Sequence, residues 1–261
     1  MTTKPHILPT DWQLKTPLDA IIFDCDGTLS HIEGINDLAA MSGHADRIRN
    51  LTEVAMGQTG IQPDIYAERL SLVQPKKEQI RLAGENYIQH VTEDVPEIIK
   101  LYQRHGKQIF VVSAGLRPTV CMLSQHLGIP DKNVFAVEIS VDGRGDYVDF
   151  DRSSVLTGNL GKRAVVGSIC QKYPRAAYVG DGMNDLPVRD QVIRFVGYGG
   201  VYYRENIASM CEYYISTLSM ASLLPLTLTA TERDALDPSE KKLYEKGFLA
   251  LQSGGVEIHS K

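Results

Sequence analysis

Short apolar runs that end at small or acidic residues recur along the chain and alternate with segments of helical periodicity. These runs predict buried strands at 19–23, 108–112, 176–179 and 194–197. Residues 96–105 and 162–173 carry apolar side chains at helical spacing and predict helices. Because strands alternate with helices, we expect an α/β fold: a doubly wound, Rossmann-like parallel sheet with helices on both faces.

A long segment separates the first two predicted strands. It spans about 85 residues, far more than one crossover helix needs. Its periodicity predicts helices at 36–41, 44–57, 63–73 and 76–90. We therefore expect a helical cap, residues 34–91, inserted into a catalytic core formed by residues 19–33 and 92–218. Residues 1–18 and 219–261 are expected as N-terminal and C-terminal extensions, the latter with one helix.

Two later segments have patterns of their own. Residues 135–139 and 146–150 alternate apolar and polar side chains around Asp142-Gly143, which predicts a β-hairpin. Asp237 is followed by Pro238 and, three positions on, by Glu240, the pattern of a capped helix start. That helix either packs on the body of the protein or contacts a partner.

Composition narrows the class of protein. The 261 residues are 43% hydrophobic and carry a net charge of −5 with both signs mixed, which argues against nucleic acid or a membrane surface as partner. The 4 cysteines are too widely spaced for a metal motif or a disulfide framework, and the N-terminus has no secretory signal pattern. We expect a soluble, cytoplasmic protein, and the sequence neither requires nor excludes an oligomer.

Two acidic clusters follow predicted strands. Asp24 and Asp26 lie after the first strand, where extended backbone directs both side chains to the same side. Asp181 and Asp185 follow the third, and a parallel sheet brings both clusters to one edge. Carboxylates so close repel each other and need a cation or a shared proton. Oxygen ligands suit Mg²⁺, whereas no pair of histidines has the spacing of a zinc site.

Groups suited to an anion accompany the acidic clusters. Ser113, followed by Ala114 and Gly115, offers a hydroxyl and backbone N–H donors after the second strand. Lys162 offers a compact positive charge. Taken singly, a serine at a strand end is more often a turn former, and a lysine more often solvated.

Together these motifs resemble, in order and rough spacing, the four motifs of the haloacid dehalogenase superfamily of phosphohydrolases. The insert is similar to that of the phosphoserine phosphatases within this superfamily. The similarity covers roughly residues 19–218, and its segments are Glu33-Gly34-Ile35, Ala55-Met56-Gly57, Glu68-Arg69-Leu70, Gln74-Pro75 and 133–136.

The resemblance implies a Mg²⁺-dependent phosphomonoesterase that hydrolyses O-phosphoserine, a small-molecule phosphomonoester, through an aspartyl-phosphate. Asp24 would be the nucleophile and Asp26 the general acid and base. Mg²⁺ would be held by Asp24, the Asp26 main-chain carbonyl and Asp181, with Asp185 in support. The phosphoryl group would be bound by Ser113, Ala114, Gly115, Lys162 and Asn184.

The resemblance also implies roles in the insert. Glu33 would face the substrate ammonium and Arg69 its carboxylate, while Met56 and Gly57 would line a pocket closed by the insert. The sequence departs from the family pattern in two places. Ala114 replaces a glycine, so a methyl group alters the fine geometry of the anion site. Residues 59–64 lack the expected aromatic side chain, so we expect a more open pocket or another substrate.

Two alternatives stay open. The same chemistry would serve another small phosphomonoester, such as phosphoethanolamine or phosphocholine, or phosphoryl transfer to an acceptor such as homoserine. A non-catalytic phosphate-sensing protein would keep the fold, but it would have no need for both Asp24 and Asp26.

Overall fold

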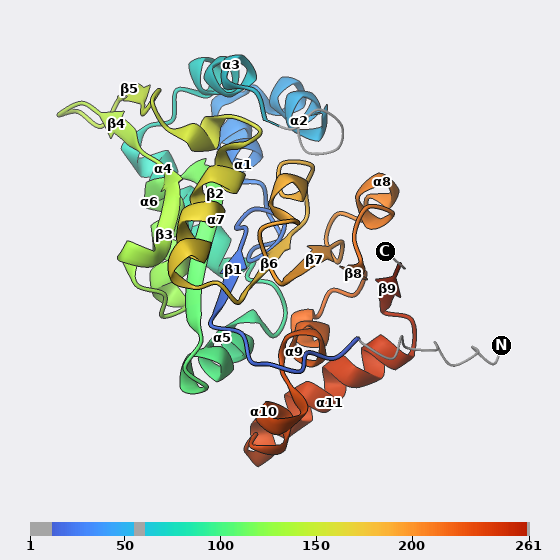
Figure 1. Ribbon diagram of the computed structural model, residues 1–261. Coiled ribbons are helices and arrows are strands. Elements are labelled where there is room, and N and C mark those ends of the chain that lie inside the picture. The colour runs from blue at the N-terminus through green and yellow to red at the C-terminus, as the bar shows by residue number, and fades with distance from the viewer. Residues whose placement is uncertain (1–11, 55–60, 260–261) are drawn as a thin grey trace.

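The computed structural model describes residues 12–54 and 61–259 (Figure 1). Within these residues a seven-stranded sheet has the order β3-β2-β1-β6-β7-β8-β9, and all its neighbours are parallel except β8 and β9. The predicted doubly wound parallel sheet is therefore confirmed. Its strands are β1 Ala20–Phe23, β2 Gln108–Leu116, β3 Val134–Val137, β6 Ala176–Gly180, β7 Arg194–Tyr198, β8 Tyr213–Ile215 and β9 Val256–Ile258.

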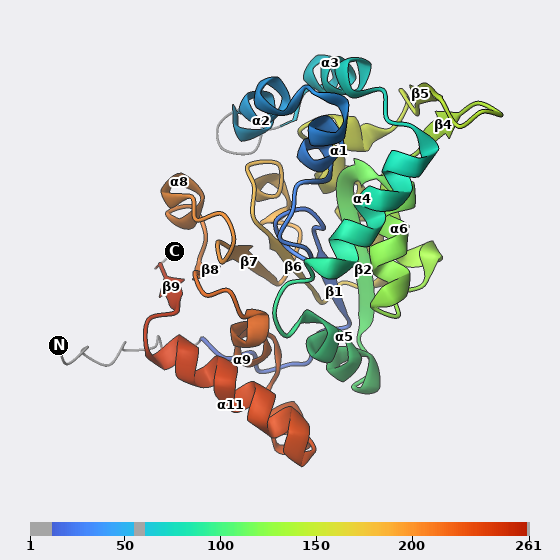
Figure 2. The ribbon, with the colours of Figure 1, turned by 180° about the vertical axis from the view of Figure 1, so that it is seen from behind.

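Alternate side chains of β1 enter two separate apolar layers. Ile21 and Phe23 pack with the layer of α5 (Val95–Arg104) and α6 (Arg117–His126). Ala20 and Ile22 pack with the layer of α7 (Gly161–Lys172). Figures 1 and 2 show α7 on one face of the sheet and α5 and α6 on the other. Because the strand is apolar at every position, it is buried on both faces, as is typical of a central parallel strand.

The central strands end side by side. Phe23 at the end of β1 pairs with Val111 of β2 and with Val179 of β6. Asp24 extends this register, because its N–H donates to the Val179 carbonyl at 2.9 Å. The loops that follow β1 and β6 therefore open at the same edge, which is where ligands bind in open α/β sheets.

The described part of the insert between β1 and β2 contains helices where the periodicity predicts them. They are α1 Gly34–Ser42, α2 Ala45–Val54, α3 Pro63–Val73 and α4 Lys77–Gln89. Gly43, in the left-handed conformation with φ 80°, ends α1, and Pro63 begins α3. Helices α1, α2 and α3 lie together at one end of the molecule, whereas α4 runs beside α6 (Figures 1 and 2).

The predicted hairpin is only partly right. Its first half belongs to the main sheet, where β3 pairs in parallel with β2. The hairpin itself is shorter, β4 (Ile139–Val141) with β5 (Tyr147–Phe150), and the Asp142 carboxylate accepts N–H hydrogen bonds from Arg144 and Asp146 in its turn. Alternation of polar and apolar residues does not reveal which strand is the pairing partner, which explains the error.

The C-terminal extension packs on the body of the protein. Helix α11 (Pro238–Gln252) begins at the predicted capping box, in which Asp237 accepts the Glu240 N–H and Glu240 accepts the Asp237 N–H. Its residues Tyr244 and Leu251 are buried, which favours the packing alternative over a partner contact. Two short helices, α9 (Leu223–Thr227) and α10 (Ala230–Asp234), precede it, and β9 then adds an antiparallel edge strand beside β8.

Two expectations from composition can be compared with the structure. The 4 cysteines, Cys25, Cys121, Cys170 and Cys211, are all free thiols. No helix within residues 12–54 and 61–259 combines the length and the apolar character needed to cross a bilayer.

Candidate active site

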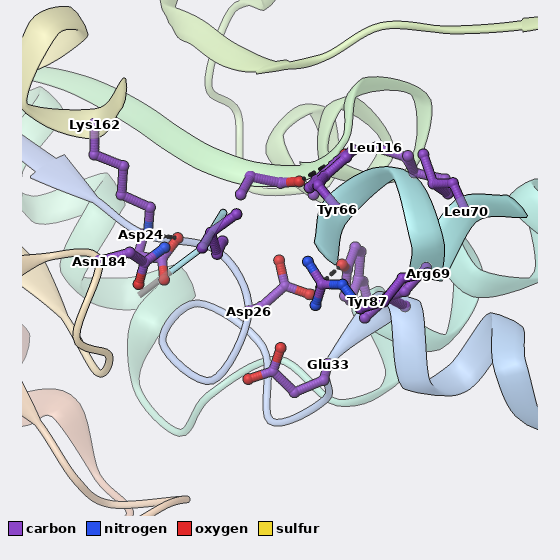
Figure 3. Close-up of a pocket in the computed structure, with 14 residues that line it drawn as sticks. Asp24, Asp26, Glu33, Tyr66, Arg69, Leu70, Tyr87, Leu116, Lys162 and Asn184 are labelled. Atoms are coloured by element: carbon purple, nitrogen blue, oxygen red, sulfur yellow. Dashed lines mark hydrogen bonds and ion pairs between the residues drawn. The ribbon is translucent and has the colours of Figure 1, made fainter. Parts of the chain in front are cut away.

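A pocket lies between the carboxyl edge of the sheet and the insert helices (Figure 3). Predicted site residues that line it are Asp24, Asp26, Glu33, Arg69, Ala114, Gly115, Lys162 and Asn184. Three more predicted residues are buried next to this lining: Ser113 donates to Asp26, Asp185 accepts from Lys162, and Asp181 lies beside Asp24. The sequence thus predicts a set of residues that the fold brings together from five separate segments of the chain. Met56 and Gly57 lie outside the described residues.

Lys162 joins the two acidic clusters. Its Nζ lies 2.8 Å from Asp24 Oδ1 and 2.6 Å from Asp185 Oδ1, and only 2% of the residue is exposed. Burial acts to lower the pKa of Lys162, but the charges of Asp185 and Asp24 outweigh it and the pKa is raised. The ammonium therefore stays charged beside the carboxylates. Asp185 is held further by the Tyr178 hydroxyl at 2.5 Å and the Gly182 N–H at 2.9 Å.

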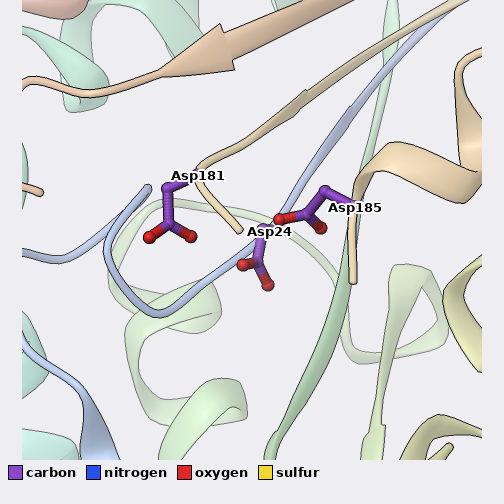
Figure 4. Close-up of side chains that lie close together, drawn as sticks. All are labelled: Asp24, Asp181 and Asp185. Atoms are coloured by element: carbon purple, nitrogen blue, oxygen red, sulfur yellow. The ribbon is translucent and has the colours of Figure 1, made fainter. Parts of the chain in front are cut away.

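Three carboxylates form a compact cluster. Oxygens of Asp24, Asp181 and Asp185 lie within 4.8 Å of one another, and all three residues are buried (Figure 4). Asp24 Oδ2 and Asp181 Oδ1 are buried without a hydrogen-bond partner. A buried carboxylate oxygen without a partner is costly, and the cluster consists of oxygen ligands alone. These features fit a hard divalent cation such as Mg²⁺.

The protonation of the cluster follows from its burial. Burial raises the pKa of Asp24 well above its ordinary value; Lys162 opposes this, and Asp185 and Asp181 add to it. Burial also raises the pKa of Asp181 to about 6, although Arg204 acts in the opposite direction. Without a cation, Asp24 and Asp181 therefore hold protons more tightly than exposed carboxyls do.

Asp26 lies outside this cluster and is held by three donors. The Gly34 N–H at 2.7 Å and the Tyr87 hydroxyl at 2.5 Å both donate to Oδ1. The Ser113 hydroxyl donates to Oδ2 at 3.2 Å. The carboxylate is thus fixed at the pocket wall, where it is 9% exposed.

The predicted phosphate-binding segment lies close to Asp26. Ser113 Oγ also accepts the Gly115 N–H at 2.8 Å, so its hydroxyl is engaged with both neighbours. A Cβ on Gly115 would lie 3.0 Å from Asp26 Oδ2, so a glycine here permits the close approach of the two segments. Across the pocket, Asn184 Oδ1 is buried without a partner.

Glu33 and Arg69 face the pocket from the insert side. Glu33 Oε1 and Arg69 Nε are buried without hydrogen-bond partners, and the residues are 8% and 5% exposed. Burial raises the pKa of Glu33 well above its ordinary value and lowers that of Arg69. A buried guanidinium with a free N–H and a buried carboxyl oxygen without a donor are suited to a ligand that carries both charges.

The structure adds three residues that the sequence did not single out. Arg204 donates from Nη1 to the Asp181 main-chain oxygen at 3.0 Å and lies 2.5 Å from Asp181 Oδ2. Tyr87 and Tyr66 line the pocket. The only signal for Arg204 is its position in the loop after β7, next to the end of β6, and the two tyrosines resemble ordinary core residues of amphipathic helices.

Tyr66 gives the pocket an aromatic side chain from α3, outside residues 59–64. Its ring lies 5.2 Å from that of Phe150, and its hydroxyl donates to the Ala114 carbonyl at 3.0 Å. The pocket therefore has an aromatic wall that also ties the insert to the segment around Ser113.

Comparisons with known proteins show the family to which the chain belongs. The family model for haloacid dehalogenase-like hydrolases matches residues 21–189. The phosphoserine phosphatase of Bos taurus is 31% identical over 200 residues, which cover 76% of this chain and 89% of the relative. The phosphoserine phosphatase of Homo sapiens is 30% identical over the same coverage.

Solved structures share the fold. A phosphoserine phosphohydrolase-like protein from Francisella tularensis superposes with a TM-score of 0.71 at 23% identity, over 79% of this chain and 100% of that protein. A substrate-bound phosphoserine phosphatase superposes with a TM-score of 0.70 at 22% identity, over 80% of this chain and 98% of that protein. The chain belongs to the haloacid dehalogenase-like hydrolase family, as a phosphatase related to the phosphoserine phosphatases.

Proposed function

We propose that this chain hydrolyses O-phosphoserine to serine and phosphate in a Mg²⁺-dependent reaction that passes through an aspartyl-phosphate on Asp24. The observation that carries the proposal is the pairing, in one pocket, of a buried reactive centre with a charged pair suited to an amino acid. Lys162 binds Asp24 Oδ1 and leaves Oδ2 without a partner, while Glu33 and Arg69 face the same space. Relatives named phosphoserine phosphatase support this choice of substrate.

The reaction divides into two steps. An Asp24 carboxylate oxygen forms a bond to phosphorus as the phosphorus–oxygen bond to serine breaks, and Asp26 gives its proton to the departing serine oxygen. Asp26 then removes a proton from a water molecule that attacks the aspartyl-phosphate, which releases phosphate and restores Asp24. The hydrogen bonds to both oxygens of Asp26 hold it ready for both transfers.

Mg²⁺ would be held by Asp24, the Asp26 main-chain carbonyl and Asp181, with Asp185 in support. When bound, the ion would supply positive charge against the phosphoryl oxygens. The phosphoryl group would be contacted by Lys162, the Ser113 hydroxyl, the N–H groups of Ala114 and Gly115, and Asn184.

Recognition of serine would come from the insert. Arg69 would bind the substrate carboxylate with its free guanidinium donors, and Glu33 would accept a hydrogen bond from the ammonium. Residues 34–91 would act as a cap over the core (19–33 and 92–218), and the closed cap would exclude bulk water from the pocket while the phosphoryl group is transferred.

A phosphate-release screen tests the proposal. It compares O-phosphoserine with phosphoethanolamine, which lacks the carboxylate, and with phosphocholine, and it tests homoserine as an acceptor. We expect phosphoserine to be the best substrate by kcat/KM and Mg²⁺ to be required. A preference for phosphoethanolamine would contradict the role of Arg69, and phosphohomoserine as a product would favour phosphoryl transfer.

A further inference from the structure

Helix α4 reaches from the insert to the reactive loop through one side chain. Tyr87, near the C-terminal end of α4, donates its hydroxyl to Asp26 Oδ1 at 2.5 Å (Figure 3). The residue is fully buried, and its ring packs with the core layer that contains Phe23. Asp26 also lines the pocket. The Tyr87 hydroxyl therefore connects a side chain of the core directly to a candidate reacting group.

We propose that Tyr87 is a positioning residue, which fixes the Asp26 carboxylate so that Oδ2 exchanges the proton with the leaving serine oxygen and then with water. This inference rests on the proposed function, because it assumes that Asp26 is the general acid and base. It goes beyond that function by assigning the orientation of Asp26 to a tyrosine from outside the sequence motifs.

The two groups that donate to Asp26 Oδ1, the Gly34 N–H and the Tyr87 hydroxyl, lie in close contact with each other. A Cβ on Gly34 would lie 2.1 Å from the Tyr87 hydroxyl oxygen, so only glycine lets the Gly34 N–H and the hydroxyl share Asp26 Oδ1. With two hydrogen bonds, Oδ1 is fully engaged. The other oxygen, Oδ2, lies beside Ser113 and Gly115 of the predicted phosphate-binding segment. Oδ2 is thus the oxygen next to which the transferred phosphoryl group would lie.

The part of α4 that carries Tyr87 is itself held in place. The Ser30 hydroxyl donates to the Tyr87 carbonyl at 3.1 Å, which ties α4 to the loop that carries Asp26. One turn earlier, Gly84 lets α4 approach α6, because a Cβ there would lie 2.4 Å from Met122 Sδ. A rigid donor on a well-packed helix reduces the freedom of the carboxylate before the substrate arrives.

The test replaces only the hydroxyl, in Tyr87→Phe. Its matched control is Tyr102→Phe. Tyr102 is a fully buried tyrosine of α5, and its hydroxyl forms a hydrogen bond of 2.5 Å with the Thr227 hydroxyl. Steady-state rates and single-turnover phosphorylation are measured with O-phosphoserine and with p-nitrophenyl phosphate. The aryl ester is included because its leaving oxygen needs little protonation.

For Tyr87→Phe we expect kcat on phosphoserine to fall about tenfold or more, with KM nearly unchanged. Single-turnover phosphorylation should slow with phosphoserine but keep its rate with the aryl phosphate. Tyr102→Phe should keep the wild-type kcat on both. A second variant, Gly34→Ala, pushes the Tyr87 hydroxyl away from Asp26 Oδ1. It should likewise slow phosphorylation with phosphoserine but not with the aryl phosphate, and it replaces Tyr87→Phe as the test if that variant does not fold.

Other outcomes overturn the inference. Wild-type rates for Tyr87→Phe, an equal loss of phosphorylation rate with both esters, or a rise in KM alone would each show that the hydroxyl does not position the acid. A wild-type protein that releases no phosphate from any ester would overturn the proposed function itself, and this inference with it. The two failures are therefore distinguished by the wild-type measurement.

Discussion

Arg204 contacts Asp181 twice, through the main-chain oxygen at 3.0 Å and through Oδ2 at 2.5 Å. The guanidinium thereby neutralises one side of a buried acidic cluster and leaves Asp181 Oδ1 without a partner. Arg204 is thus a third cation near the carboxylates, behind the pocket lined by Lys162 and Arg69. Even with it, burial keeps the pKa of Asp181 raised, at about 6.

The raised carboxyl pKa values predict a pH-dependent response to Mg²⁺. A carboxyl whose pKa rises from 3.8 to about 6 on folding holds its proton more tightly in the folded protein. In the metal-free protein, the contribution of Asp181 to stability is therefore lost as the pH rises from about 4 to 6. The proposed Mg²⁺ site requires deprotonated carboxylates, so the gain in Tm on adding Mg²⁺ should be larger at about pH 8 than at about pH 5.

Thermal unfolding with and without Mg²⁺ checks this prediction, and Asp181→Asn is its control. The variant removes a charged ligand and a titrating group, so it should show little gain in Tm from Mg²⁺ at either pH. A gain for the wild type that is equal at both pH values would contradict the proposed coupling of metal binding to proton release.

Removal of the proposed nucleophile should abolish turnover without unfolding the protein. In Asp24→Asn the amide cannot attack phosphorus, so we expect kcat to fall about 10³-fold or more. Lys162 keeps Asp185 as a partner at 2.6 Å, and one buried charge is removed, so circular dichroism should show a folded protein. A variant that kept most of its activity would refute the assignment of Asp24.

Substrate specificity should depend on Arg69. We expect Arg69→Lys, which keeps the charge but not the two-pronged geometry, to lower kcat/KM for phosphoserine about 100-fold, mostly through KM. The value for p-nitrophenyl phosphate should change little. Arg47→Ala is the matched control, because Arg47 is an exposed insert arginine whose ion pair with Glu68 spans 2.6 Å. Equal losses on both esters in Arg69→Lys would argue against carboxylate recognition.

The C-terminal extension should contribute to stability through a buried ion pair. Lys107 Nζ lies 2.5 Å from Glu232 of α10 and also donates to the Leu18 carbonyl at 3.1 Å. Its side chain is 1% exposed, so Glu232→Gln would leave a buried ammonium poorly paired. We expect the free energy of unfolding to fall by about 3 kcal/mol, with kcat unchanged.

Urea denaturation measures this loss. Glu68→Gln, which breaks the exposed pair with Arg47, provides the comparison and should change the unfolding free energy by less than about 1 kcal/mol. If both variants lost the same unfolding free energy, the buried Lys107–Glu232 pair would stabilise the protein no more than the exposed pair, which would contradict the prediction.

The motifs at the strand ends could be predicted because their chemistry is local. Asp24 and Asp26 directly follow an apolar strand, and parallel topology alone brings them to the edge where β6 delivers Asp181. Lys162 reaches the same edge because it lies in the first turn of a helix that begins there. In each case the residue type, the strand and one topological rule were sufficient.

The remaining contacts depend on packing between distant segments. Tyr87 lies 61 positions from Asp26, and its spacing from Ile80 and Ala83 indicates only burial. Arg204 meets Asp181 because two neighbouring strands end together, a relation that no local pattern records. Strand β9 is equally hidden, since three residues become a strand only through their pairing with β8.

The most direct measurement of the central claim is the covalent state of Asp24 during turnover. Wild-type protein is mixed with O-phosphoserine and Mg²⁺, quenched rapidly in acid, and digested for mass spectrometry. We expect one added phosphoryl group on Asp24, absent when Mg²⁺ is omitted. Hydrolysis of phosphoserine with no phosphoryl group on Asp24 at any quench time, or with the group on another residue, would contradict the account.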